Sequence, residues 1–179
     1  KKLNTHAVLE EYVPQVLQKI QWKKSMRWGE FDLNWGRPLK SILALYNRKK
    51  LVFDFHHLKS SNWTFIDKEF EEKKKIFSSY KEYKNFFKKV NIIIDHNQRK
   101  KLIEKKLNEI SKKKNIIIEK NIKLLNEVVD LTDEPNVIVC EFNKKFLDIP
   151  KEILIITMQY HQKYFPTFDS KGNLTNEFL

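Results

Sequence analysis

LIITMQYHQKYFPTFD, residues Leu154 to Asp169, is the stretch that decides the fold. The apolar run from Ile153 to Met158 predicts a buried helix that starts near Pro150, because proline suits the first helical turn. The helix cannot continue through Pro166, which lacks a backbone donor and favours extended geometry at Phe165. We therefore expect an apolar helix that delivers a polar and aromatic cluster to a strand.

The segments next to this stretch predict further strands. The turn at residues 171–173 is followed by a strand from Leu174 that pairs back, and a natural domain seldom ends there. Since position 1 is also not methionine, we expect a fragment. Upstream, the β-branched run from Asn136 to Phe142 predicts a central strand with both faces covered. The single cysteine, Cys140, lies in this run and is expected to be a buried thiol.

The remaining chain mixes helical and strand patterns. Helices are expected over 5–20, 79–89, 97–114 and 121–131, and short apolar segments over 91–95 and 115–119. We therefore predict an α+β fold with a mixed or antiparallel sheet and packed helices. The lead-in helix is placed at 1–22 and a single α+β domain, truncated at its C-terminal hairpin, at 23–179.

A β-hairpin is predicted over 41–58, with its turn at 47–50. In its second arm Leu51, Phe53 and Phe55 face one way, while Val52, Asp54 and His56 face the other. His56 and His57 therefore point to opposite faces and predict no metal site. The charged run from Asp67 to Lys75 is expected to form a mobile loop or an exposed helix.

The charge of the chain favours a polyanion partner. Its 179 residues carry a net charge of +12. All but four of the basic residues are lysines, and a bias towards Lys, Asn and Ile is typical of an AT-rich coding background, so we expect part of the charge to be compositional. No apolar run is long enough for a membrane helix, and the N-terminus has no signal-peptide pattern, so the cytoplasm is the expected location.

The residues alone predict no catalytic site. Three isolated glycines cannot form a phosphate-binding loop. His161 has no acidic partner at helical spacing, which favours a structural or hydrogen-bonding histidine. The sequence therefore indicates a basic α+β module with no catalytic residues, no metal site and no cofactor of its own.

Several motifs in a fixed order resemble a known family. They are Met26-Arg27-Trp28-Gly29, Arg37-Pro38, Glu127-Val128, Glu134-Pro135, Phe142, Phe146-Leu147, Pro150, Met158, His161 to Pro166, Asp169, Gly172, Leu174 and Phe178. In this order they resemble the beta subunit of bacterial heterotetrameric glycyl-tRNA synthetase, in its N-terminal half. One departure is clear: the family usually carries a Gly-His-Arg-Phe motif after the hairpin, and the region around residues 66–69 has none of it.

The resemblance implies a division of labour. The alpha subunit of this family holds the class II site that activates glycine with ATP and Mg, and the beta subunit supplies tRNA recognition. The chain would then be inactive alone, with the alpha subunit and the tRNA for glycine as partners. The resemblance also implies the α+β module shared with the phenylalanyl-tRNA synthetase beta subunit. A purely architectural module and a vestigial editing domain are the alternatives.

Candidate site residues come from the motif stretches. Arg27, Arg37 and Lys163 are the candidates for RNA contact, because arginine and lysine bind phosphates. Each has a structural alternative: the arginines can bond loop carbonyls, and Lys163 can lie over Tyr164. Trp28, His161, Tyr164, Phe165 and Pro166 are expected to form a structural motif. Tyr164 and Phe165 should be packed, and His161 and Lys163 should lie near the surface.

Overall fold

The computed structural model describes the chain except for residues 1–3, 69–70 and 120. Its helices and small antiparallel and mixed sheets confirm the α+β class. The described residues form two compact units, one ending at Phe86 and the other beginning at Phe87, here called unit 1 and unit 2. Compactness does not establish independent folding, so the single domain predicted over 23–179 stays a prediction.

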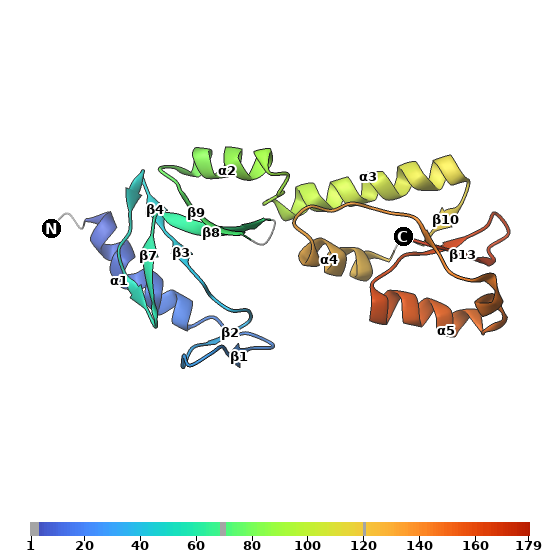
Figure 1. The fold of residues 1–179 in the computed structure, drawn as a ribbon, viewed down its shortest axis with the longest axis horizontal. Coiled ribbons are helices and arrows are strands. Elements are labelled where there is room, and N and C mark those ends of the chain that lie inside the picture. The colour runs from blue at the N-terminus through green and yellow to red at the C-terminus, as the bar shows by residue number, and fades with distance from the viewer. Residues whose placement is uncertain (1–3, 69–70, 120) are drawn as a thin grey trace. The chain divides into compact units, whose positions relative to one another are not determined.

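Unit 1 is built from one helix and a set of short strands (Figure 1). The elements are α1 (Thr5–Gln18), β1 (Met26–Arg27), β2 (Asn34–Trp35), β3 (Ile42–Leu43), β4 (Leu45–Tyr46), β5 (Lys49–Lys50), β6 (Asp54–Phe55), β7 (Leu58–Ser61), β8 (Trp63–Lys68) and β9 (Glu71–Ile76), and α2 (Tyr80–Lys89) leads into unit 2. The pairs β1–β2, β4–β5, β6–β7 and β8–β9 are antiparallel, and β3 pairs with β7 in parallel.

The helix α1 belongs to the core of unit 1. Its N-cap is Asn4, whose side chain accepts from the backbone of His6, one residue before the expected start. Leu9, Val13 and Leu17 recur at helical spacing and pack against the buried cluster of Leu33, Leu51, Phe53 and Phe55. The segment expected to be a lead-in helix is therefore part of the packing of unit 1.

The predicted hairpin over 41–58 is right in its first turn and wrong in its second arm. Asn47 and Arg48 both have positive φ, 47° and 64°, as a two-residue type I′ turn requires. The predicted alternation is confirmed, since Leu51, Phe53 and Phe55 are buried. The second arm is not one strand, because the chain turns again at His56, with φ 52°, and pairs β6 with β7.

The charged run from Asp67 to Lys75 is neither a loop nor a helix. In the described residues of this run β8 and β9 pair in antiparallel fashion, with Trp63 opposite Ile76, and residues 69–70 lie outside the described part. The Lys74 ammonium lies 4.3 Å from the centre of the Trp63 ring. Cross-strand contacts with aromatic residues thus favour a strand over the loop that charge alone predicts.

Unit 2 packs two helices against a four-stranded sheet. The elements are α3 (His96–Lys114), β10 (Ile117–Ile118), α4 (Ile122–Leu131), β11 (Cys140–Glu141), a 3₁₀ turn η1 (Lys144–Asp148), α5 (Lys151–Ile156), a π-helical segment η2 (Thr157–Gln162), β12 (Pro166–Phe168) and β13 (Leu174–Phe178). The sheet order is β10-β12-β13-β11, with antiparallel neighbours. In Figure 1, α3 and α4 lie side by side.

Local residues define the ends of these helices. The Asp95 side chain accepts from the backbone of Gln98 at 2.9 Å, and Asn121 accepts from Leu124 at 3.0 Å. Asn115 ends α3 in the left-handed conformation. Ile103 and Leu107 of α3 are buried, as predicted, in the cluster that also contains Leu124, Leu125, Val129 and Phe165.

Two predicted strands of unit 2 are wrong. Residues 91–95 form an irregular connection, and only Cys140–Glu141 of the expected central strand pairs, at the edge of the sheet. Ile138 and Cys140 are exposed, whereas Val137 and Val139 are partly buried. A β-branched run with one covered face has the same composition as a central strand, so the sequence wrongly predicted a central strand here. Cys140 lies on the uncovered face, and its thiol is therefore exposed.

Candidate nucleic-acid interface

Arg27 holds a loop together in unit 1. It lies on β1, and its guanidinium forms an ion pair with Asp32 and donates through Nε to the Phe31 carbonyl at 3.3 Å. Its side chain is nevertheless 59% exposed, so the pair is weak in water. The geometry matches the structural alternative, and phosphate contact by Arg27 stays a prediction.

Arg37 is exposed just after β2. Within the described part of the chain its guanidinium has no hydrogen-bond or ion-pair partner. The preceding backbone is fixed, because a Cβ at Gly36 would lie 2.8 Å from the Trp22 ring, which also packs edge-on against Trp35. Arg37 is therefore an exposed cation without a partner among the described residues, and it follows a well-anchored glycine.

Aromatic residues line a pocket beside these two arginines. The pocket has a volume of about 550 Å³, and its walls include Trp28, Phe31, Trp35 and Phe65. Trp28 is fixed by a hydrogen bond from its ring nitrogen to the Trp35 carbonyl at 3.0 Å. Phe31 stacks on His57, with ring centres 3.6 Å apart. Phe31 is exposed, whereas Trp28, Trp35 and Phe65 are partly buried. Aromatic rings near cations can serve as surfaces on which unpaired bases stack.

Lys163 lies at the junction between η2 and β12 in unit 2. It ends the π-helical segment with φ 62°, and the Tyr164 backbone donates to the Met158 carbonyl at 2.8 Å. Its ammonium pairs with Glu127 of α4 at 2.5 Å and lies 5.6 Å from the centre of the Tyr160 ring. The hydrogen bond from Lys163 lowers the pKa of Glu127. The Lys163 ammonium is thus already paired with the Glu127 carboxylate, which competes with the predicted contact to phosphate.

Phe165 and His161 follow the predicted division into packed and surface residues, whereas Tyr164, which was expected to be packed, is exposed. Phe165 and Pro166 are buried, and the Phe165 backbone exchanges two hydrogen bonds with Leu179. Tyr164 stacks on Phe178, with ring centres 4.6 Å apart, and stays 38% exposed. His161 is exposed. The apolar run before them is less buried than predicted, since Ile153 and Ile156 are exposed.

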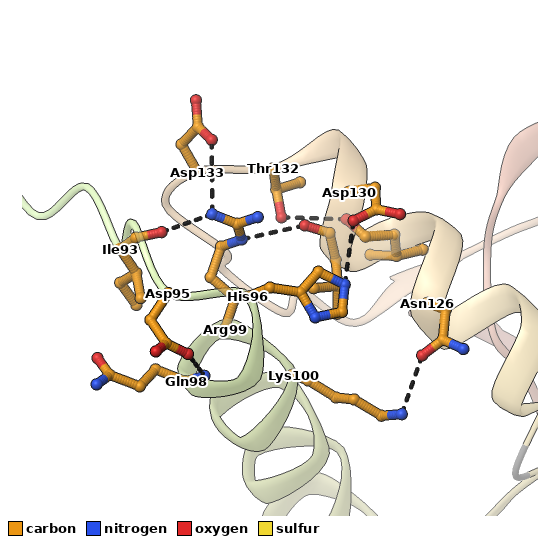
Figure 2. A network of polar contacts seen from close by, with 12 residues as sticks. Ile93, Asp95, His96, Gln98, Arg99, Lys100, Asn126, Asp130, Thr132 and Asp133 are labelled. Carbon is orange, nitrogen blue, oxygen red and sulfur yellow. Dashed lines mark hydrogen bonds and ion pairs between the residues drawn. The ribbon is translucent and has the colours of Figure 1, made fainter. Parts of the chain in front are cut away.

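A polar network around α3 was missed by the sequence analysis (Figure 2). Arg99 donates to the Ile93 carbonyl at 2.7 Å and to the Val129 carbonyl at 3.1 Å, while His96 lies 3.1 Å from Asp130. These contacts join the first turn of α3 to the end of α4. The sequence signal for this network was Arg99, the one arginine in a lysine-rich helix. Its planar guanidinium donates to several carbonyls in fixed directions, which the ammonium of a lysine does not.

The described residues contain no helix that could cross a membrane. They also contain no group of three or more metal-ligating side chains.

Comparison with known proteins identifies the family. The family described as glycyl-tRNA synthetase beta subunit matches residues 1–179. The chain belongs to this family. It is similar to the "Glycine--tRNA ligase beta subunit" of Rickettsia peacockii, with 36% identity over 96% of the chain and 26% of the relative. The protein of that name from Dictyoglomus thermophilum is 34% identical over 99% of the chain and 26% of its own length.

The chain thus spans about a quarter of the length of these relatives. The residues by which it resembles the beta-subunit family also meet in the structure. Lys163, in the motif 161–166, pairs with Glu127, in the motif 127–128. Trp28 and Arg27 close their own loop. Several residues of the family motifs therefore stabilise the fold through internal contacts. Their role differs from that of exposed residues, which can bind a partner.

Proposed function

We propose that the chain is a non-catalytic part of a glycine–tRNA ligase that helps to hold tRNA and to brace the assembly. This proposal rests mainly on the family match over all 179 residues. In this proposal the whole ligase attaches glycine to its tRNA in the cytoplasm, and an alpha subunit holds ATP and Mg. The fold would then correspond to the module shared with the phenylalanyl-tRNA synthetase beta subunit.

The ionisable groups near the Lys163 junction support a role without acid–base chemistry. Glu127 has its pKa lowered by Lys163, and Asp169 has its pKa lowered by hydrogen bonds from Asn173. Both carboxylates are therefore ionised at neutral pH and engaged inside the fold. A general acid or base works best with a pKa near the working pH, which neither group has.

The charge and the aromatic pocket support contact with tRNA. A net charge of +12 favours association with a polyanion. Arg37 is an exposed cation without an internal partner in the described residues, and it precedes Pro38 on the wall of the aromatic pocket. Phosphate contact from the arginine together with stacking in the pocket is a usual way to hold single-stranded RNA.

A titration with labelled tRNA for glycine at several salt concentrations tests this proposal. Binding that weakens steeply with salt, with a log–log slope of several units, is expected because each phosphate contact releases counterions. Absence of binding even at low salt would exclude the RNA role. An Arg37→Ala variant should bind more weakly than the parent, whereas Arg48→Ala, which removes an equal charge in unit 1, serves as the control.

The architectural alternative rests on a separate observation. Ile153, Ile156 and Tyr160 lie at helical spacing on α5 and η2 and are all more than half exposed. An apolar face of this kind is typical of a protein contact. If the chain binds no tRNA but associates with the alpha subunit, and Ile153→Asp weakens that association, the architectural function is the correct one.

A further inference from the structure

The exposed face of α3 carries a line of lysines. Lys101, Lys105, Asn108 and Lys112 follow one another at spacings of four, three and four residues, and all are exposed. At about 100° per residue these four positions fall within about 60° of one another. The opposite face carries the buried Ile103 and Leu107. These three lysines and Asn108 are called the lysine face.

Three other basic residues of α3 have partners inside unit 2. Arg99 bonds carbonyl groups, Lys100 donates to Asn126 at 2.9 Å, and Lys114 pairs with Glu177 of β13. These three are used inside unit 2. Across the described ranges, Lys101 and Lys112 have no partner.

Lys105 has only a weak partner. Its ammonium lies 3.8 Å from Glu109, which Lys106 also approaches at 3.6 Å. The Lys105 side chain is 72% exposed, so this pair contributes little in water. The lysine face therefore presents close to its full positive charge to solvent. Lys101 and Lys105, four residues apart, repel each other, and a bound polyanion would remove this repulsion.

The helix that carries the lysine face is firmly held at both ends. Asp95 caps its first turn, and Arg99 joins that turn to the end of α4, as Figure 2 shows. At the other end, Asn115 ends the helix and Lys114 contacts the sheet through Glu177. The lysine positions are therefore set before a ligand arrives, which lowers the entropy cost of binding.

We propose that the lysine face binds the phosphate backbone of double-stranded RNA, an inference that rests on the proposed tRNA-binding function. The face is a straight line about 16 Å long, because eleven residues separate Lys101 from Lys112 at about 1.5 Å each. Its side chains are lysine and asparagine only, so it has no ring on which an unpaired base could stack. Duplex RNA is recognised mostly by backbone and shape, which suits such a face.

Two charge-matched variants of the chain test this inference. One variant combines Lys101→Gln, Lys105→Gln and Lys112→Gln. The control combines Lys144→Gln, Lys145→Gln and Lys151→Gln, which removes three exposed lysines elsewhere in unit 2. Glutamine keeps the helix propensity of lysine, so both variants should fold. Helix content and the thermal midpoint are measured first, and the lysine-face variant should be at least as stable as the parent, because it loses like-charge repulsion.

Binding to tRNA for glycine, to an RNA duplex of unrelated sequence and to a single-stranded RNA is then measured against salt. The lysine-face variant should lose about 2–3 units of the log–log salt slope on duplex RNA, because each phosphate contact contributes about 0.9. At 0.1 M salt this corresponds to a loss of affinity on the order of 100-fold. The control variant should keep most of the slope, and the lysine-face variant should lose more affinity for the duplex than for the single strand.

Three outcomes would overturn the inference while leaving the proposed function intact. They are an unchanged slope in the lysine-face variant, an equal loss in the control, and a loss in the lysine-face variant that is no greater on duplex than on single-stranded RNA. If the unmodified chain binds none of the three RNAs, the proposed function fails and the inference fails with it.

Discussion

Replacing Arg99 by alanine should strongly destabilise unit 2. The Arg99 side chain is only 13% exposed and donates two short hydrogen bonds, to the carbonyls of Ile93 and Val129. A bond from a charged donor contributes about 1.5–3 kcal/mol, so the two together contribute about 3–6 kcal/mol. Asp133, at 3.9 Å and largely exposed, adds little. Since typical domains are stable by about 5–15 kcal/mol, the loss would be large.

Urea unfolding followed by far-ultraviolet circular dichroism measures the effect. With a slope of about 2 kcal/mol per M, the midpoint should fall by roughly 1.5–3 M. All four tryptophans lie in unit 1, so their fluorescence reports a different part of the chain. Arg99→Lys should also destabilise unit 2, because it keeps the positive charge but loses the planar guanidinium that bonds both carbonyls. Arg37→Ala is the control, and a loss in Arg99→Ala within about 0.5 kcal/mol of that control would refute the reasoning.

Three further predictions follow from individual residues. Arg48→Gly should raise stability by about 0.5–1 kcal/mol in thermal unfolding, because Arg48 has φ 64° beside Asn47 in a turn that favours Asn-Gly; a lower midpoint would contradict this. Glu127 and Asp169 have folded pKa values below their ordinary 4.5 and 3.8, so the stability that they contribute is complete above those ordinary values and is lost as pH falls through the lowered ones. The double variant Glu127→Gln with Asp169→Asn should therefore lose less free energy of unfolding between pH 7 and pH 3 than the parent. An equal loss in both proteins would contradict this. Cys140 is exposed and should react with a thiol reagent in the native chain as fast as in urea. A much slower reaction in the native chain would contradict this and would support a buried thiol.

Periodicity predicted those parts of the fold in which one face is buried. The alternation of Leu51, Phe53 and Phe55 was right, because each residue contributes to the same core cluster. The helix that becomes α3 was right for the same reason, with Ile103 and Leu107 at helical spacing. In both cases the local pattern and the tertiary packing agree.

The errors occur where tertiary contacts decide. Cys140 looked central because its neighbours are β-branched, yet the sequence cannot tell whether one face or both are covered. The run from Asp67 to Lys75 looked like a solvated loop, and the partners that make it a strand lie on β8.

The candidate site could be predicted only in part. Sequence identified Lys163 as a notable residue, but its carboxylate partner, Glu127, comes from another helix and became visible only in the structure. The same holds for Arg27, which pairs with Asp32 across its loop. The sequence did not single out the lysine face, because which lysines are used internally depends on contacts such as those of Lys100 and Lys114.

A crosslinking map of a complete glycine–tRNA ligase bound to its tRNA tests the central claim most directly. The account predicts crosslinks from the RNA to the segment around Lys101 to Lys112, because that face presents exposed lysines of which, among the described residues, only Lys105 has a partner, and a weak one. It also predicts crosslinks near Arg37. A map in which the tRNA crosslinks elsewhere in the ligase, and residues 4–179 crosslink only to protein, would contradict the account and establish an architectural role.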